Sequence, residues 1–176
     1  MINENKLDSN AVAPSENDRF DFIRSHRLWR YGPLILWAAF IFLASTKLMS
    51  ASNTSTILRP VVLWLFPNIS EATLNLIHFM IRKAGHFSEY AIFALLAAHA
   101  FRTSSRELLR KRWFWASLSL VVIYALGDEF HQSFVRSRTA SIYDSMIDSF
   151  GGLTALALLT IQKHRRHRQD LHDRQD

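Results

Sequence analysis

The 176-residue sequence contains no cysteine, so disulfide bonds, thiolate catalysis and cysteine-ligated metal sites are excluded. It also lacks the His-Glu-x-x-His pattern of metalloproteases and the Gly-x-Ser-x-Gly turn that presents a nucleophilic serine in hydrolases. The first thirty residues have no apolar core beside a short basic start, and no cleavable signal peptide is predicted. These absences leave no familiar catalytic signature in the chain.

Apolar residues are plentiful but unevenly placed. They make up 49% of the chain, including thirteen Phe and five Trp, yet the mean hydropathy is only +0.01. The two ends are polar and charged, whereas the middle holds long apolar runs such as "LSLVVIYALG". Such runs offer no polar face to water, which disfavours a soluble helical bundle.

Four of these runs approach the roughly 20 apolar residues that a membrane-spanning helix needs. The first contains Pro33, a residue suited to a helix start. We therefore expect an all-α fold, an integral membrane bundle of four transmembrane helices. The expected spans are residues 31–48, 86–101, 113–130 and 145–162. The expected organisation is a disordered cytoplasmic tail (1–27), a membrane domain (28–162) and a basic cytoplasmic tail (163–176).

The loop between the first two spans contains a further segment. Residues 57–67 are apolar but too short to span, which is typical of an amphipathic or re-entrant piece. Ser70 and Glu71 then suit a helix start. This second helix either lies on the membrane or runs on into the span at 86–101.

The basic residues predict the orientation. Five Lys or Arg precede the first span, five lie in residues 102–112 and five follow the last span, which is fifteen of the 21 in the chain. Loops rich in Lys and Arg stay in the cytoplasm. We expect a multi-pass protein of the bacterial cytoplasmic (inner) membrane with both termini cytoplasmic. The net charge of +6 then reflects topology and attraction to membrane lipids, not nucleic-acid binding.

Helical rise places ionisable groups of three spans at one depth. Counted from the nearest cytoplasmic basic residue, Glu89 lies about 20 Å along its helix, Asp128 about 24 Å and Asp148 about 22 Å, at about 1.5 Å per residue. The hydrocarbon core is about 30 Å thick. These groups should therefore meet just below the outer surface, because unpaired charges at such depth are costly.

The residues at this level form the candidate site. One interpretation is a polar cavity that binds a ligand, and the alternatives are a salt-bridge network that fixes packing, or side chains that reach into water. The four acids Asp128, Glu129, Asp144 and Asp148 are candidate ligands of a divalent cation. The complete candidate set is Lys83, His86, Glu89, Tyr90, Asp128, Glu129, His131, Gln132, Arg138, Ser141, Asp144 and Asp148.

The order and spacing of several of these residues resemble the VanZ-like family of small bacterial membrane proteins. The matching segments are "KAGHFSEY", "DEFHQSF" and "RSRTASIYD", followed by Gly151. Arg136-Ser137 departs from a frequent Pro-Gly, and Asp148 stands where an Asn is usual. The resemblance implies a role in the cell envelope and a link to teicoplanin-type antibiotic resistance, without supplying a reaction.

Two functions remain open, so the sequence does not decide whether the protein is an enzyme. The first is a binding protein whose cavity holds a lipid-linked cell-wall intermediate or a lipoglycopeptide and so contributes to glycopeptide tolerance. The second is a metal-dependent membrane enzyme acting on a lipid phosphate head group, with His86 or His131 as general base. Ion transport ranks last, because it needs titratable groups at several depths.

Overall fold

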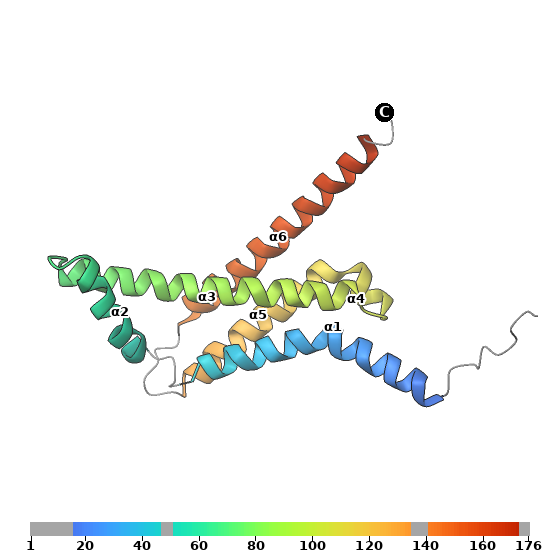
Figure 1. Cartoon of the computed structure of the whole chain (residues 1–176), viewed down its shortest axis with the longest axis horizontal. Helices are drawn as coiled ribbons and strands as arrows, with labels where there is room; N and C mark the ends of the chain where they lie inside the picture. Colours follow the sequence, from blue (N-terminus) through green and yellow to red (C-terminus); the bar gives the residue numbers. More distant parts are fainter. Residues whose placement is uncertain (1–15, 47–50, 135–140, 173–176) are drawn as a thin grey trace, which may run out of the picture.

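The computed structural model describes residues 16–46, 51–134 and 141–172. All regular structure in these ranges is helical, which agrees with the expected all-α fold (Figure 1). The described helices are α1 (Glu16–Ala44), α2 (Ala51–Leu65), α3 (Glu71–Arg102), α4 (Glu107–Lys111), α5 (Trp113–Gln132) and α6 (Ile142–His172).

The first helix starts earlier than expected. A helix start at Pro33 is wrong, because α1 begins at Glu16 and Pro33 lies inside it. No glycine or proline separates Glu16 from Tyr31, so nothing in that stretch ends the helix. Residues 16–27 of the expected tail are therefore helical, and α6 likewise continues into the C-terminal basic segment as far as His172.

Helix α3 resolves the alternatives for the loop after the first span. The Ser70 side chain accepts a hydrogen bond from the backbone N–H of Thr73 at 3.2 Å, which confirms the expected helix start. From Glu71 the helix runs without interruption to Arg102, through the whole of the expected second span. The apolar segment before it forms a separate helix, α2, which packs against α3.

Helix α3 is the centre of the structure. It packs against α1, α2, α4, α5 and α6, and α5 also packs against α6. Its buried face carries the small residues Ala94, Ala97 and Ala98, which let neighbouring helices approach closely. Val121 of α5 and Leu156 of α6 complete this part of the core and are fully buried.

The closest approach occurs where α6 crosses α3. A Cβ atom at Gly151 would overlap the backbone carbonyl of Phe87, and one at Gly152 would lie 2.7 Å from a methyl carbon of Val121. Only glycine allows backbones to pack at this distance. The Gly-Gly pair therefore sets the register of α6 against both α3 and α5.

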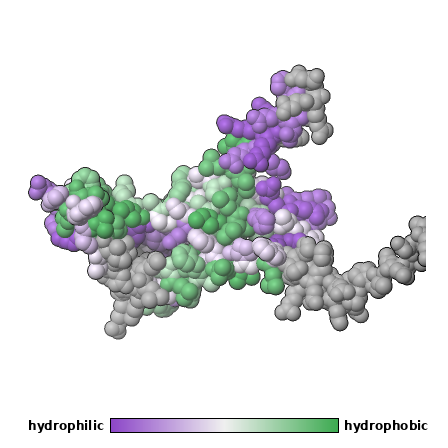
Figure 2. All heavy atoms as spheres, in the orientation of Figure 1, coloured by the Kyte–Doolittle hydropathy of each residue, from purple (hydrophilic) through white to green (hydrophobic). Residues whose placement is uncertain are grey.

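Large apolar side chains cover much of the outer surface. Leu36, Trp64, Trp115, Ile123 and Phe130 are all more than two-thirds exposed. Figure 2 shows hydrophobic residues over the middle of the molecule and hydrophilic residues on the C-terminal part of α6. Exposed apolar surface of this extent is unfavourable in water and marks a surface that contacts lipid or protein.

The lengths and compositions of the helices support part of the expected four-span arrangement. Within the described residues, one helix, over Ile142–Asp170, is long and apolar enough by itself to cross a membrane. The other expected spans lie in α1, α3 and α5, apart from residues 47–48, which fall outside the described ranges. Those three helices combine apolar runs with charged or polar residues, which lowers their mean hydropathy.

The α3–α6 crossing leads to a first prediction. Gly151→Ala should lower the thermal stability of the purified protein in detergent, because the new methyl group meets the rigid backbone of Phe87. Gly85→Ala is the matched control, since a Cβ there meets nothing within 4 Å. That change should be neutral or stabilising, by up to about 1 kcal/mol. Equal melting temperatures for the two variants would contradict the close packing.

Candidate functional site

The first part of the site joins the middle of α3 to the beginning of α6. The Lys83 ammonium group donates a hydrogen bond to Oδ1 of Asp144, and both side chains are largely buried, with 15% and 11% exposed. The ammonium also lies 5.3 Å from the centre of the Phe79 ring. A buried charge needs such a partner because burial removes its hydration.

A second pair lies one turn farther along both helices. His86 Nδ1 and Asp148 Oδ1 are 3.4 Å apart, and Asp148 is completely buried. This separation exceeds that of a well-formed hydrogen bond. Within the described residues, both carboxylate oxygens of Asp148 lack a hydrogen-bond donor. The carboxylate of Asp148 can therefore accept further hydrogen bonds.

The end of α5 supplies a third group, which reaches α1. Gln132 Nε2 donates to Asp128 Oδ2 at 2.9 Å and lies 3.4 Å from Ser45 Oγ. All three residues are buried. The spacing from Asp128 to Gln132 is one helical turn, so the amide returns to the carboxylate of its own helix. The contact with Ser45 ties this turn to the end of α1.

Glu129 links the end of α5 to the start of α6. Its Oε2 accepts a hydrogen bond from the backbone N–H of Ser141 at 2.7 Å. Its other oxygen, Oε1, is buried and has no donor among the described residues. Next to it, the Ser145 hydroxyl of α6 donates to the carbonyl of Ala125 at 3.3 Å. These bonds hold the two helix ends together.

The polar groups described above, together with Tyr90, form what we call the network. Tyr90 is fully buried. Its ring lies 6.3 Å from that of Phe93 and 6.4 Å from that of Tyr124, between ring centres. Its hydroxyl group has no hydrogen-bond partner among the described residues. A buried hydroxyl usually finds a partner, so this one has the capacity for a further bond.

The remaining candidates lie at the edge of the network. Glu89 is half-buried, and its backbone carbonyl accepts a 2.9 Å hydrogen bond from Trp37 Nε1. The His131 ring packs 4.7 Å from the Phe42 ring, on the α1 side. Arg138 lies outside the described residues. The structure thus brings most of the candidates together at the junction of α3, α5 and α6, with His131 set apart against α1.

The acids do not form a metal site in the part of the chain that is described. No three His, Asp or Glu side chains there are arranged to hold a metal ion. Asp144 is bonded to Lys83, and Asp128 is bonded to Gln132. Asp144 and Asp128 therefore each have a partner of their own, and the geometry does not favour a cation shared by the four acids.

The sequence analysis did not include two further residues that bond to the network, Ser45 and Trp37. Ser45 lies at the end of the first apolar run, at the same expected depth as the acids, and this position was a usable signal. Trp37 lies deep within that run, and its bond to the carbonyl of Glu89 depends on how α1 packs against α3. No spacing in the sequence indicates that contact.

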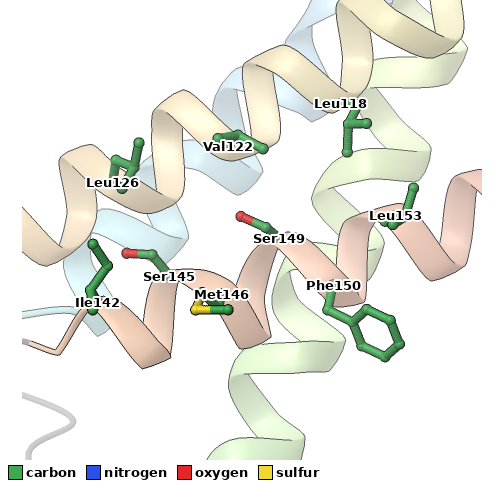
Figure 3. A pocket seen from close by; sticks show the side chains of 9 residues that line it. All are labelled: Leu118, Val122, Leu126, Ile142, Ser145, Met146, Ser149, Phe150 and Leu153. Carbon is green, nitrogen blue, oxygen red and sulfur yellow. The ribbon is translucent and has the colours of Figure 1, made fainter.

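An apolar groove runs beside the network between α5 and α6, with a volume of about 580 Å³. In Figure 3, Leu118, Val122 and Leu126 point from α5 toward α6, and Ser145 and Ser149 lie on the facing side. Its complete lining is Leu118, Val122, Leu126, Ile142, Ser145, Met146, Ser149, Phe150 and Leu153. The groove is thus mainly apolar, whereas a polar cavity was expected at this level.

The buried ion pair generates a stability prediction. Lys83→Met should destabilise the protein by about 3–5 kcal/mol, because it leaves the Asp144 carboxylate buried without its cation. Lys111→Met is the matched control, since Lys111 pairs with Glu107 on the exposed surface of α4. It should have little effect. The free energy of unfolding in detergent is measured for both variants. A similarly small loss of stability in the two would contradict a structural role for the Lys83–Asp144 pair.

Comparison with known protein families identifies the family of this chain. The VanZ/LLP1 family profile matches residues 31–163, a range that includes every residue of the network. Neither the curated proteins nor the solved structures that were compared contain a match to the chain. Because the matched segment covers most of the sequence, the chain belongs to the VanZ/LLP1 family of membrane proteins, which is associated with resistance to glycopeptides of the teicoplanin type.

Proposed function

We propose that the protein is a multi-pass protein of the bacterial cytoplasmic membrane that uses α1, α3, α5 and α6 as its four spans, with both termini in the cytoplasm. The exposed apolar side chains of these helices support this placement, since lipid would cover them. The start of α1, the α4 segment and the end of α6 lie at the same end of the molecule (Figure 1). These are the basic segments, as expected of cytoplasmic ends.

The orientation can be tested with reporter fusions. A phosphatase reporter fused after Arg138 should be active, because this enzyme works only outside the cytoplasm, and a fluorescent-protein fusion there should be dark. Both readouts should reverse for fusions after Arg110, which lies in α4. Matching readouts at the two positions would rule out a span between them.

We further propose that the buried network binds the polar head of an amphiphilic molecule. The observation that carries this proposal is a set of buried polar atoms that have no hydrogen-bond partner among the described residues. The set includes both carboxylate oxygens of Asp148, Oε1 of Glu129 and the hydroxyl of Tyr90. Leaving such groups unpaired costs about 1–3 kcal/mol each. A ligand that satisfies them gains binding energy from the same groups.

The chemistry of these atoms indicates what the ligand head must contain. A carboxylate only accepts hydrogen bonds, so the ligand must donate them. The Lys83 ammonium is already bonded to Asp144, which leaves less positive charge for a phosphate. Four acids against Lys83 and His86 also favour a cation over an anion. Sugar hydroxyls and amines fit this requirement better than a phosphate group does.

The groove between α5 and α6 supplies a place for the apolar part of the same molecule. Ser145 lines the groove and directly follows Asp144 of the network in the sequence, so the groove and the network share the first turn of α6. The groove lies between two apolar helices and opens outward, so a hydrocarbon chain can enter it from the lipid. A lipoglycopeptide, which joins sugars and amines to an acyl chain, combines both parts. Binding it at the membrane surface would keep the antibiotic from its target and give tolerance.

Tyr90 allows the binding proposal to be separated from a purely structural role. Tyr90→Phe should weaken teicoplanin binding by about fivefold to tenfold, the effect of one lost hydrogen bond. The melting temperature should not fall, because the removed hydroxyl has no hydrogen-bond partner in the described part of the chain. Calorimetry with the purified full chain measures the affinity for teicoplanin. Vancomycin, which lacks the acyl chain, is the comparison ligand and should bind more weakly.

Tyr143→Phe is the matched control, since Tyr143 is 72% exposed and lies outside the network. It should bind teicoplanin as the unmodified protein does. If Tyr90→Phe binds teicoplanin with unchanged affinity, or if vancomycin binds equally well, the proposed head-and-chain site is wrong.

A further inference from the structure

A second cavity lies far from the network, between the end of α3 and the C-terminal half of α6. Its volume is about 520 Å³. Arg102 contributes from the last turn of α3, and every other lining residue belongs to one face of α6. The lining is Arg102, Leu159, Gln162, Lys163, Arg166 and Asp170.

The charge of this cavity is positive. Arg102, Lys163 and Arg166 face it together with a single acid, Asp170. Within the described residues none of the three cations forms an ion pair with Asp or Glu. The Arg102 guanidinium lies 5.4 Å from the centre of the Trp113 ring, which holds it at the rim. Two arginines and a lysine that have no acidic partner among the described residues match the charge of a phosphate group.

The position of the cavity along α6 selects the source of that phosphate. Lys163 follows Asp148 by 15 residues, about 22 Å along the helix. The cavity therefore lies near the opposite membrane surface, at the depth of lipid head groups. Leu159 is one turn deeper than Lys163, where the first carbons of a lipid chain would lie.

We propose that this cavity binds the head group of an anionic phospholipid, with its phosphate between Arg102, Lys163 and Arg166. The site is separate from the one proposed for the amphiphile, and it requires only that the chain spans the membrane. A lipid bound there would hold the end of α3 and the emerging part of α6 at the membrane surface. It would act as a structural ligand of the cytoplasmic end of the bundle.

Native mass spectrometry of the full chain tests the proposal. The protein is mixed in detergent with equal amounts of phosphatidylglycerol and phosphatidylcholine, and the retained lipids are counted. The unmodified chain should retain phosphatidylglycerol in preference. Lys163→Gln/Arg166→Gln should reduce that retention about tenfold or more, since each basic residue near a surface contributes strongly to binding of anionic lipid.

The matched control is Arg165→Gln/Arg168→Gln, which removes the same charge from exposed positions of α6 outside the cavity. It should retain the lipid as the unmodified chain does. Equal losses in both variants, or no preference for phosphatidylglycerol, would overturn the proposal. Inorganic phosphate in millimolar excess should not displace the lipid, and displacement would instead assign the cavity to free phosphate. The retention of phosphatidylglycerol does not depend on whether the protein binds teicoplanin, so the two proposals can fail separately.

Discussion

A charge enclosed by apolar helices is stable only beside a partner, and this requirement organises the structure. Lys83 on α3 meets Asp144 on α6, and His86 meets Asp148 one turn farther on. Helices that carry these groups can pack in few other ways without leaving a charge unpaired. The small residues of α3 and the glycines of α6 then allow the backbones to come close enough for the pairs to form.

Some polar groups of the network have hydrogen-bond partners among the described residues and others do not. Asp128 and Gln132 satisfy each other, and one oxygen of Glu129 is bonded to the backbone of Ser141. The hydroxyl of Tyr90 and the carboxylate of Asp148 nevertheless lack hydrogen-bond partners among the described residues. These groups are the reason why we propose the network as the place where a ligand binds.

The two ends of the bundle have opposite chemistry. The junction of α3, α5 and α6 holds a surplus of acids and hydrogen-bond acceptors, whereas the far end of α6 carries exposed Lys and Arg. An apolar groove between α5 and α6 adjoins the acidic end. The VanZ/LLP1 family, to which the chain belongs, is associated with glycopeptide resistance. This contrast is the basis for proposing different lipid-like ligands at the two ends of the bundle.

The sequence by itself determined the helical class and the family, and it predicted a common depth for the ionisable groups. Each of these follows from composition, from short motifs or from the constant rise of a helix. The sequence did not indicate the start of α1 at Glu16, because Pro33, a residue typical of a first helical turn, lies inside this helix.

Only the tertiary structure decided which groups meet. Sequence spacing gives the height of Lys83 but not its partner, and it does not indicate that Gln132 reaches Ser45 or that Trp37 bonds to the carbonyl of Glu89. These contacts depend on the rotation of each helix about its own axis. That rotation is set by packing between helices distant in sequence, above all where Gly151 lies against the backbone of Phe87.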